Sequence, residues 1–225
     1  MGYTLQFGQV VHYIPYLLGG AWISLQIAVL CFSGGMAIGM VNAVALAFGN
    51  RLTAALARAY VTFFTNTPGL VQIYFIYYAL PDLHVVLDSY QAVVLGIMLN
   101  AGGYLALILR SGFLSVHANE VDAAVTLGMS RWLLLRYVIA PHMLRVLYPA
   151  ISNKFILMVL GTAVAGVFGV EDLMGRTINA NAESFRSVEL LSITATIYVA
   201  MTVCATFALS AVGMALLRRR VRFTN

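Results

Sequence analysis

Charged residues are scarce in this chain. Only 9% of its 225 residues are Asp, Glu, Lys or Arg, and Lys154 is its single lysine. Soluble domains carry about 25% charged residues, whereas 61% of this chain is hydrophobic. These totals exclude an ordinary soluble domain and indicate a protein embedded in a lipid membrane. In such a protein the net charge of +5 fits a basic cytoplasmic face, so we expect no nucleic-acid partner.

The sequence also lacks the motifs of enzymes and metal proteins. Its two cysteines, Cys31 and Cys204, lie in separate apolar runs, which argues against a disulfide framework and excludes a CxxC metal site. The GxxxxGK[ST] loop that binds ATP is absent, as are HExxH and GxSxG. The histidines are scattered and suggest no metal cluster: His12, His84, His117 and His142. We therefore predict a non-catalytic chain that holds no cofactor or metal of its own.

Long apolar runs separated by short polar links make up most of the chain. A helix of about 20 apolar residues spans the hydrocarbon core of a bilayer. Five runs reach that length: residues 17–48, 60–80, 89–109, 147–170 and 190–217. We predict an all-α polytopic membrane protein with five transmembrane helices. It is expected to form one membrane domain over residues 1–225, with its core at 17–217.

Two of these runs contain residues that disturb a helix. Pro68, in the second run, removes a backbone donor and is expected to kink the helix. Thr and Asn side chains nearby can bond the freed carbonyl groups. The end of the fourth run, residues 161–169, is rich in glycine. We expect a broken or loosely wound helix there.

The charges that are present fall unevenly on the two sides of this topology. Most arginines lie in the links after the first and third runs and in the C-terminal tail, residues 218–222. The opposite side has most of the acids: Asp82, Asp88, Glu171, Asp172, Glu183 and Glu189. Because basic residues favour the cytoplasmic side, we predict a cytoplasmic C-terminus and an N-terminus outside.

The longest charge-rich segment between the apolar runs is the link at residues 119–141, NEVDAAVTLGMSRWLLLRYVIAP. We interpret this link, called the elbow below, as two short helices that meet at Gly128 and are exposed in the cytoplasm. Asn119 is expected to cap the first helix and Ser130 the second. Pro141 is expected to end the elbow.

The spacing within the elbow resembles a known motif. The residues that match are Asp122-Ala123-Ala124, Gly128, Val138 and Pro141. They follow the pattern Glu-Ala-Ala, three residues, Gly, nine residues and Ile-x-Leu-Pro, which is the EAA loop of ATP-binding-cassette (ABC) importer permeases. Further segments, such as residues 59–72 and 169–173, are similar to the same family. From about Leu17 to Arg220 the chain resembles permease subunits of polar amino acid importers, whose members serve His, Gln, Glu, Arg and opines.

The resemblance implies a type I ABC importer permease fold, as in MetI-like proteins, in the bacterial inner membrane. It implies four kinds of partner: a second homologous permease subunit in a homo- or heterodimer, two ATPase subunits that hold ATP and Mg, a periplasmic solute-binding protein, and membrane lipid. The elbow would be the coupling helix, docked in a groove of the ATPase. Its coupling residues would be Asp122, Ala123, Ala124, Gly128, Met129, Ser130, Arg131 and Pro141.

The solute path is expected to be lined by polar side chains within the runs. The candidates are Asn66, Thr67, Gln72, Asn100, Tyr104 and Thr162. Each could instead be a polar link between helices. Lys154 could lie at the cytoplasmic mouth of the path, but we expect it to extend to the membrane surface, as a lone lysine commonly does. Leu107 stands where the family commonly has Glu, one of three charged positions that are neutral here. We therefore weigh a hypothesis in which a partner subunit holds the solute.

Two other functions stay open at this point. A self-contained secondary carrier or channel would need intramembrane acids or a proton relay, and no Asp or Glu lies inside a predicted span. A membrane-embedded enzyme would need a reactive constellation, which the sequence does not provide. The permease of an ABC importer for amino acids or related small polar solutes is the leading hypothesis.

Overall fold

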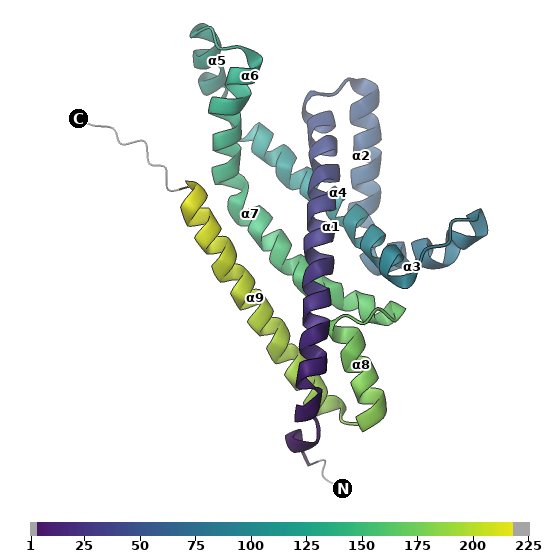
Figure 1. Ribbon diagram of the computed structural model, residues 1–225. Helices are drawn as coiled ribbons and strands as arrows, with labels where there is room; N and C mark the ends of the chain where they lie inside the picture. The colour runs from purple at the N-terminus through teal and green to yellow at the C-terminus, as the bar shows by residue number, and fades with distance from the viewer. Residues whose placement is uncertain (1–3, 218–225) are drawn as a thin grey trace. The chain divides into compact units, whose positions relative to one another are not determined.

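The computed structural model describes residues 4–217, and at Leu216 and Leu217 the backbone alone. Within that range the backbone is helical and forms no strand (Figure 1). The α-helices are α1 Ile14–Phe48, α2 Arg51–Asn66, α3 Gly69–Ala79, α4 Ser89–Leu114, α5 Ala118–Thr126, α6 Arg131–Leu134, α7 Ala140–Gly161, α8 Leu173–Ser184 and α9 Ser187–Leu217. The predicted all-α class is confirmed, and the arginine-rich tail at residues 218–222 lies outside the described residues.

Four helical stretches are long and apolar enough to cross a membrane. They are Val11–Phe48, Ser89–Leu114, Arg131–Phe168 and Ser187–Ala215. Four of the predicted spans are thus confirmed in position, although the third stretch begins well before residue 147. The predicted span at residues 60–80 is not a continuous helix, so the expectation of five single spanning helices is wrong for the described residues.

The interruption in the expected second span lies at Thr67 and Pro68. Thr67 has an extended backbone, with ψ 134°, and it ends α2. A residue before proline is pushed out of the helical region by the proline ring, and Pro68 has no N–H to continue the hydrogen-bond ladder. The chain resumes as the short apolar helix α3. The predicted kink is therefore a complete break between two helices.

The elbow runs without a stop into α7. A π-helical turn, Leu135–Ile139, joins α6 to α7, and Pro141 is the second residue of α7. A proline in a helix presses on the carbonyl four residues earlier, and that carbonyl lies inside the wider π turn. We had expected Pro141 to end the elbow, and this was wrong. The helix continues through Pro141 because its winding changes just before that residue.

The glycine-rich end of the fourth span is broken, as predicted. α7 ends at Gly161, and residues Thr162–Phe168 continue as a 3₁₀-helix. Gly169 follows with φ +77°, in the left-handed region that favours glycine. The change of winding ends the spanning stretch and leads the chain into the loop before α8.

The described chain divides into two compact units, and each is assembled from separate segments. Unit 1 comprises the described residues of Met1–Ser33, Pro68–Met98 and Phe155–Thr206. Its apolar core joins the start of α1 to α8 and α9 through Val10, Leu17, Ala21, Leu173, Ala180 and Leu190. Close backbone packing adds to it: a Cβ on Gly166 would lie 2.6 Å from the Gly175 nitrogen. Only glycine fits that approach.

Unit 2 comprises the described residues of Gly34–Thr67, Leu99–Lys154 and Phe207–Asn225. Its core joins α1, α4 and α7 through Ala43, Leu109, Met143 and Leu147. A Cβ on Gly39 would lie 2.8 Å from the Leu105 side chain, so small residues bring these helices close. Because α1, α4, α7 and α9 contribute residues to both units, neither unit is a continuous segment, and the single domain stays a prediction.

Candidate functional site

The elbow is built on a turn that requires glycine. α5 ends in two nested hydrogen bonds: the Gly128 amide donates to the Val125 carbonyl at 2.9 Å, and the Met129 amide to the Ala124 carbonyl at 3.1 Å. This is the Schellman arrangement, whose central residue adopts a left-handed conformation. Gly128 has φ +76°, and no atom lies within 4 Å of the place a Cβ would take. The predicted break at Gly128 is confirmed, and its cause is backbone conformation alone.

The two predicted helix caps of the elbow had different outcomes. Ser130 caps α6, because its hydroxyl accepts from the Leu133 amide at 3.4 Å. Asn119 does not cap α5: the helix begins earlier, at Ala118, and His117 occupies the cap position without a side-chain hydrogen bond. The extended backbone of His117 already turns the chain into the helix, so Asn119 falls inside the first turn.

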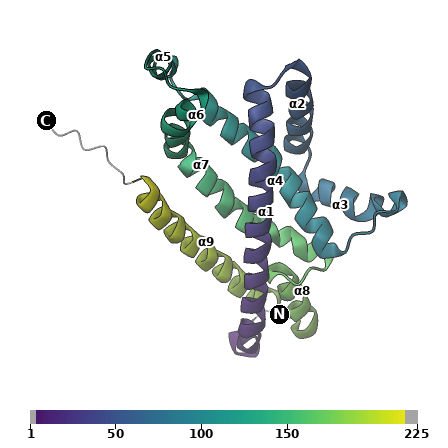
Figure 2. The ribbon, with the colours of Figure 1, turned by 45° about the horizontal axis from the view of Figure 1, so that its top comes forward.

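The elbow presents large apolar side chains to the exterior of unit 2. Leu127 is 78% exposed, Trp132 65% and Val125 59%. Asp122 and Arg131 are also exposed beside them. In Figure 2 the short coil of α5 stands off the end of α6 and α7. Exposed aromatic and aliphatic anchors with charges at the rim are typical of a surface that binds a partner protein.

A second polar feature of unit 2 lies at the broken end of α2. The helix leaves its last carbonyl groups without partners in its own ladder. Two side chains of α4 bond them: Asn100 donates to the Phe64 carbonyl at 3.0 Å, and Tyr104 to the Thr65 carbonyl at 3.2 Å. Asn66 donates back to the Thr62 carbonyl at 2.8 Å. Side chains thus satisfy freed carbonyls at the Pro68 break, as predicted, and two of them come from α4.

Lys154 lies beside this feature. Its ammonium nitrogen is 4.2 Å from the centre of the Tyr104 ring. A cation over an aromatic ring gains about 0.5–2 kcal/mol, less than the roughly 2.5–3.5 kcal/mol that a lysine costs near the centre of a bilayer. Among residues 4–217, Arg176 and Arg186 form ion pairs with carboxylates, and Lys154 does not. The ring alone therefore does not offset the charge of Lys154.

The six predicted path residues do not all fall in one unit. Asn66, Thr67, Asn100 and Tyr104 belong to unit 2, where the structure brings Asn100 and Tyr104 to the end of α2. Gln72 and Thr162 belong to unit 1 and are both buried. The Thr162 hydroxyl donates to the Val159 carbonyl at 2.8 Å, one turn earlier. Their contact with solute stays a prediction.

Sequence reasoning missed a buried polar centre in unit 1. Asp172 is fully buried and caps α8, accepting from the Gly175 amide at 2.9 Å and from the Ser24 hydroxyl at 3.1 Å. Ser24 in turn accepts from the Leu173 amide at 3.1 Å. Burial raises the pKa of the Asp172 carboxyl, and the hydrogen bonds from Gly175 and Ser24 partly oppose this. An Asp directly before a helix indicates a helix cap, so this role could have been predicted. Its hydrogen bond to Ser24 on α1 could not, because no local sequence pattern indicates it.

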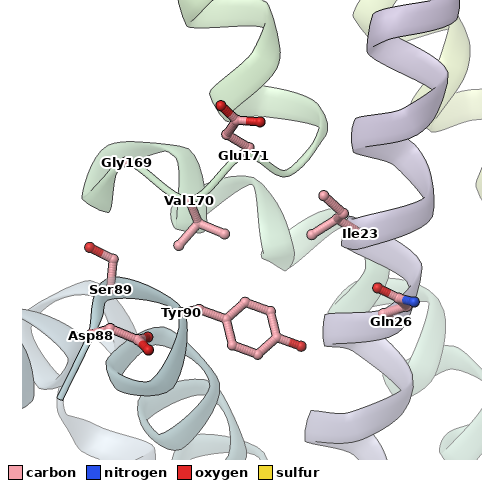
Figure 3. A pocket seen from close by; sticks show the side chains of 8 residues that line it. All are labelled: Ile23, Gln26, Asp88, Ser89, Tyr90, Gly169, Val170 and Glu171. Carbon is pink, nitrogen blue, oxygen red and sulfur yellow. The ribbon is translucent and has the colours of Figure 1, made fainter.

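Unit 1 also contains a cavity of about 480 Å³. Figure 3 shows Tyr90, from the start of α4, extending toward Gln26 on α1. The remaining lining residues are Ile23, Asp88, Ser89, Gly169, Val170 and Glu171. Its two acids are Asp88 and Glu171, and Glu171 pairs with Arg176 at 3.7 Å. Among the described residues, no group of three or more His, Cys, Asp or Glu is placed to hold a metal.

Comparison with known proteins decides the family. Residues 35–223 match the family described as binding-protein-dependent transport system inner membrane component. The chain belongs to this family. Its apolar helices are therefore those of an integral inner-membrane permease, and the predicted resemblance to ABC importer permeases is confirmed.

Three known proteins are similar to this permease over most of their length. GlnP, the glutamine transport system permease protein of Escherichia coli K12, is 37% identical over 200 residues, which cover 87% of this chain and 90% of GlnP. OccM, the octopine transport system permease protein of Rhizobium radiobacter, is 36% identical over 81% of this chain and 78% of OccM. A chain in the crystal structure of an amino acid ABC transporter with histidines is 29% identical, with a TM-score of 0.87 over 97% of this chain and 100% of that chain.

Proposed function

We propose that this permease is the transmembrane subunit of an ABC importer for amino acids or related small polar solutes. The observation that carries the proposal is the elbow: an exposed, glycine-dependent helical turn whose residues Asp122–Ala124 and Gly128 have the EAA spacing. GlnP and OccM, the similar permeases named above, are transport proteins for glutamine and octopine, which supports the solute class.

In this proposal the elbow binds in a groove of an ATPase subunit. Leu127 and Trp132 would enter an apolar groove of the partner, and Asp122 and Arg131 would make polar contacts at its rim. ATP and Mg would be bound by the ATPase, and this chain would be non-catalytic. Because α6, the π turn, α7 and the 3₁₀-helix after it form a continuous helical stretch from Arg131 to Phe168, a movement of the elbow would be transmitted directly along α7.

The partners and topology follow from the same proposal. A second homologous permease subunit, two ATPase subunits and a periplasmic binding protein would complete the importer, whose permeases are surrounded by lipid. α2 and α3 would together form a fifth crossing, interrupted at Pro68. The N-terminus would then lie outside and the C-terminus in the cytoplasm, in agreement with the basic side of the chain. Gln72, Thr162 and the polar residues at the end of α2 would line the solute path.

The elbow turn provides a sharp test. Valine at position 128 would be forced into a left-handed conformation that costs about 1–2 kcal/mol, whereas asparagine tolerates it. Neither side chain would clash, because the site is open. We expect Gly128→Val to lower ATP-dependent amino acid uptake by about tenfold or more in vesicles that contain the permease, its ATPase and its binding protein.

Gly128→Asn is the matched control and is expected to keep uptake close to that of the wild type. Both variants should be inserted in the membrane in equal amounts, as measured by immunoblotting of the vesicles. Equal uptake by the valine and asparagine variants would contradict a coupling role for the turn.

A further inference from the structure

Lys154 is a charged residue held deep within a spanning stretch. It lies roughly two and a half helical turns beyond Arg145 on α7, or about 13 Å at about 1.5 Å per residue. The hydrocarbon core of a bilayer is about 30 Å thick. If Arg145, which is exposed, marks the membrane surface, Lys154 lies near the middle of the core. Charged residues at that depth face a protein interior or a water-filled path and are usually functional.

The alternative that Lys154 extends back to the membrane surface does not agree with its position. The ammonium lies 4.2 Å from the Tyr104 ring centre, and Tyr104 is itself nearly two turns deeper than Arg110, the last arginine of α4. The Tyr104 hydroxyl donates to the Thr65 carbonyl at 3.2 Å, which fixes the ring. The cation therefore lies at depth against a ring that a hydrogen bond to the end of α2 holds in place.

The charge of Lys154 is not neutralised by a carboxylate of the described residues. The residues between Arg131 and Phe168 include no acid, and Lys154 makes no ion pair with a carboxylate of the described residues. An aromatic ring covers one side of an ammonium group, which has three N–H donors to direct elsewhere. A carboxylate is the anionic group that amino acids carry and that an ammonium binds by charge-assisted hydrogen bonds.

We propose that Lys154 and Tyr104 form a carboxylate subsite on the solute path of this permease. The inference rests on the proposed import of amino acids and deepens it by assigning the group that recognises the solute. Lys154 binds the carboxylate directly, and the Tyr104 ring positions the ammonium. The carboxylate comes either from the main-chain end of an amino acid or from an acidic side chain.

Weak binding to the purified assembly of permease and ATPase tests this subsite without a binding protein. Saturation-transfer NMR gives dissociation constants for glutamine, glutamate and glutamine α-amide, which lacks the main-chain carboxylate. We expect the wild type to bind glutamine about tenfold more tightly than its α-amide, because the α-amide cannot form the charge-assisted hydrogen bond between a carboxylate and Lys154. Tighter binding of glutamate than of glutamine would assign the subsite to the side-chain carboxylate instead.

Lys154→Met is the decisive variant, since methionine has a similar length and suits an apolar environment. It should bind all three compounds with similar affinity, so that the preference for a carboxylate disappears. Lys154→Arg should keep that preference, and so should Tyr104→Phe, which retains the ring. A purely structural role of Lys154 would weaken binding of all compounds equally.

Two outcomes separate this inference from the proposed function. If Lys154→Met keeps the wild-type preference for a carboxylate while the same sample hydrolyses ATP and imports amino acids in vesicles, the subsite is wrong and the function stands. If the wild-type assembly hydrolyses no ATP and imports no amino acid, both are overturned.

Discussion

Replacing Asp172 with alanine would remove the acceptor at the centre of the buried hydrogen bonds in unit 1. Loss of a helix cap costs about 1 kcal/mol, and a buried donor without an acceptor costs about 1–3 kcal/mol. Two donors are affected, the Gly175 amide and the Ser24 hydroxyl. The loss is partly offset because no carboxylate needs to be buried. We expect Asp172→Ala to lower the free energy of unfolding of unit 1 by about 2 kcal/mol.

Cys31 provides a local probe for this change. It is fully buried in the same unit, where its thiol donates to the Val94 carbonyl at 3.4 Å. With the exposed Cys204 replaced by serine, a thiol-reactive dye can label the detergent-solubilised protein only when unit 1 opens. A loss of about 2 kcal/mol raises the open population, and with it the labelling rate, roughly thirtyfold.

Asp172→Asn is the control, because its side-chain oxygen can still accept from the Gly175 amide. We expect its labelling rate to stay within about threefold of the wild type, since asparagine is as good a helix cap as aspartate. The reasoning is refuted if Asp172→Ala labels at the wild-type rate, or if the alanine and asparagine variants label equally fast.

Three further predictions concern the stability of the two units. Burial raises the pKa of the Asp172 carboxyl, so protonation of Asp172 favours the folded state. The free energy of unfolding should be greatest below the ordinary pKa near 4 and should fall as the pH rises through the raised pKa. Melting temperatures measured at several pH values should show this fall, and Asp172→Asn should show a weaker dependence on pH. Gly175→Ala should destabilise unit 1 by more than 2 kcal/mol, on the order of other overpacked sites, because its Cβ would clash with the Val170 carbonyl; a wild-type melting temperature would disprove this. Tyr60→Phe should cost about 1 kcal/mol by removing the 2.6 Å bond to the Leu99 carbonyl, and an unchanged melting temperature would count against that bond.

The local features of the fold could be predicted because their causes are local. Apolar length alone located four spanning stretches, and the spacing of the elbow located Gly128, which the structure gives a left-handed conformation. Ser130 was found as a cap by residue type and position. Asn119 and Pro141 were misjudged, because the start of α5 and the winding before α7 each depend on backbone geometry that residue type does not determine.

Features that join distant segments could not be predicted from the sequence. The Ser24–Asp172 bond links residues from α1 and the start of α8, and no periodic pattern connects them. The same holds for Lys154 and Tyr104, whose contact joins α7 to α4. Lys154 was expected to extend to the membrane surface because a lone lysine commonly does. Its actual partner depends on how the helices pack.

Photocrosslinking from the elbow tests the proposed coupling most directly. Leu127 is 78% exposed at the elbow turn, and Phe185, 83% exposed at the end of α8, is the control position. Each is changed to cysteine after Cys31 and Cys204 are replaced by serine, and is then labelled with a benzophenone maleimide in membranes that contain the native partners. Irradiation should join Leu127→Cys, but not Phe185→Cys, to a protein that carries a GxxxxGK[ST] loop. Adducts with that protein from Phe185→Cys alone, or from neither position, would contradict the account.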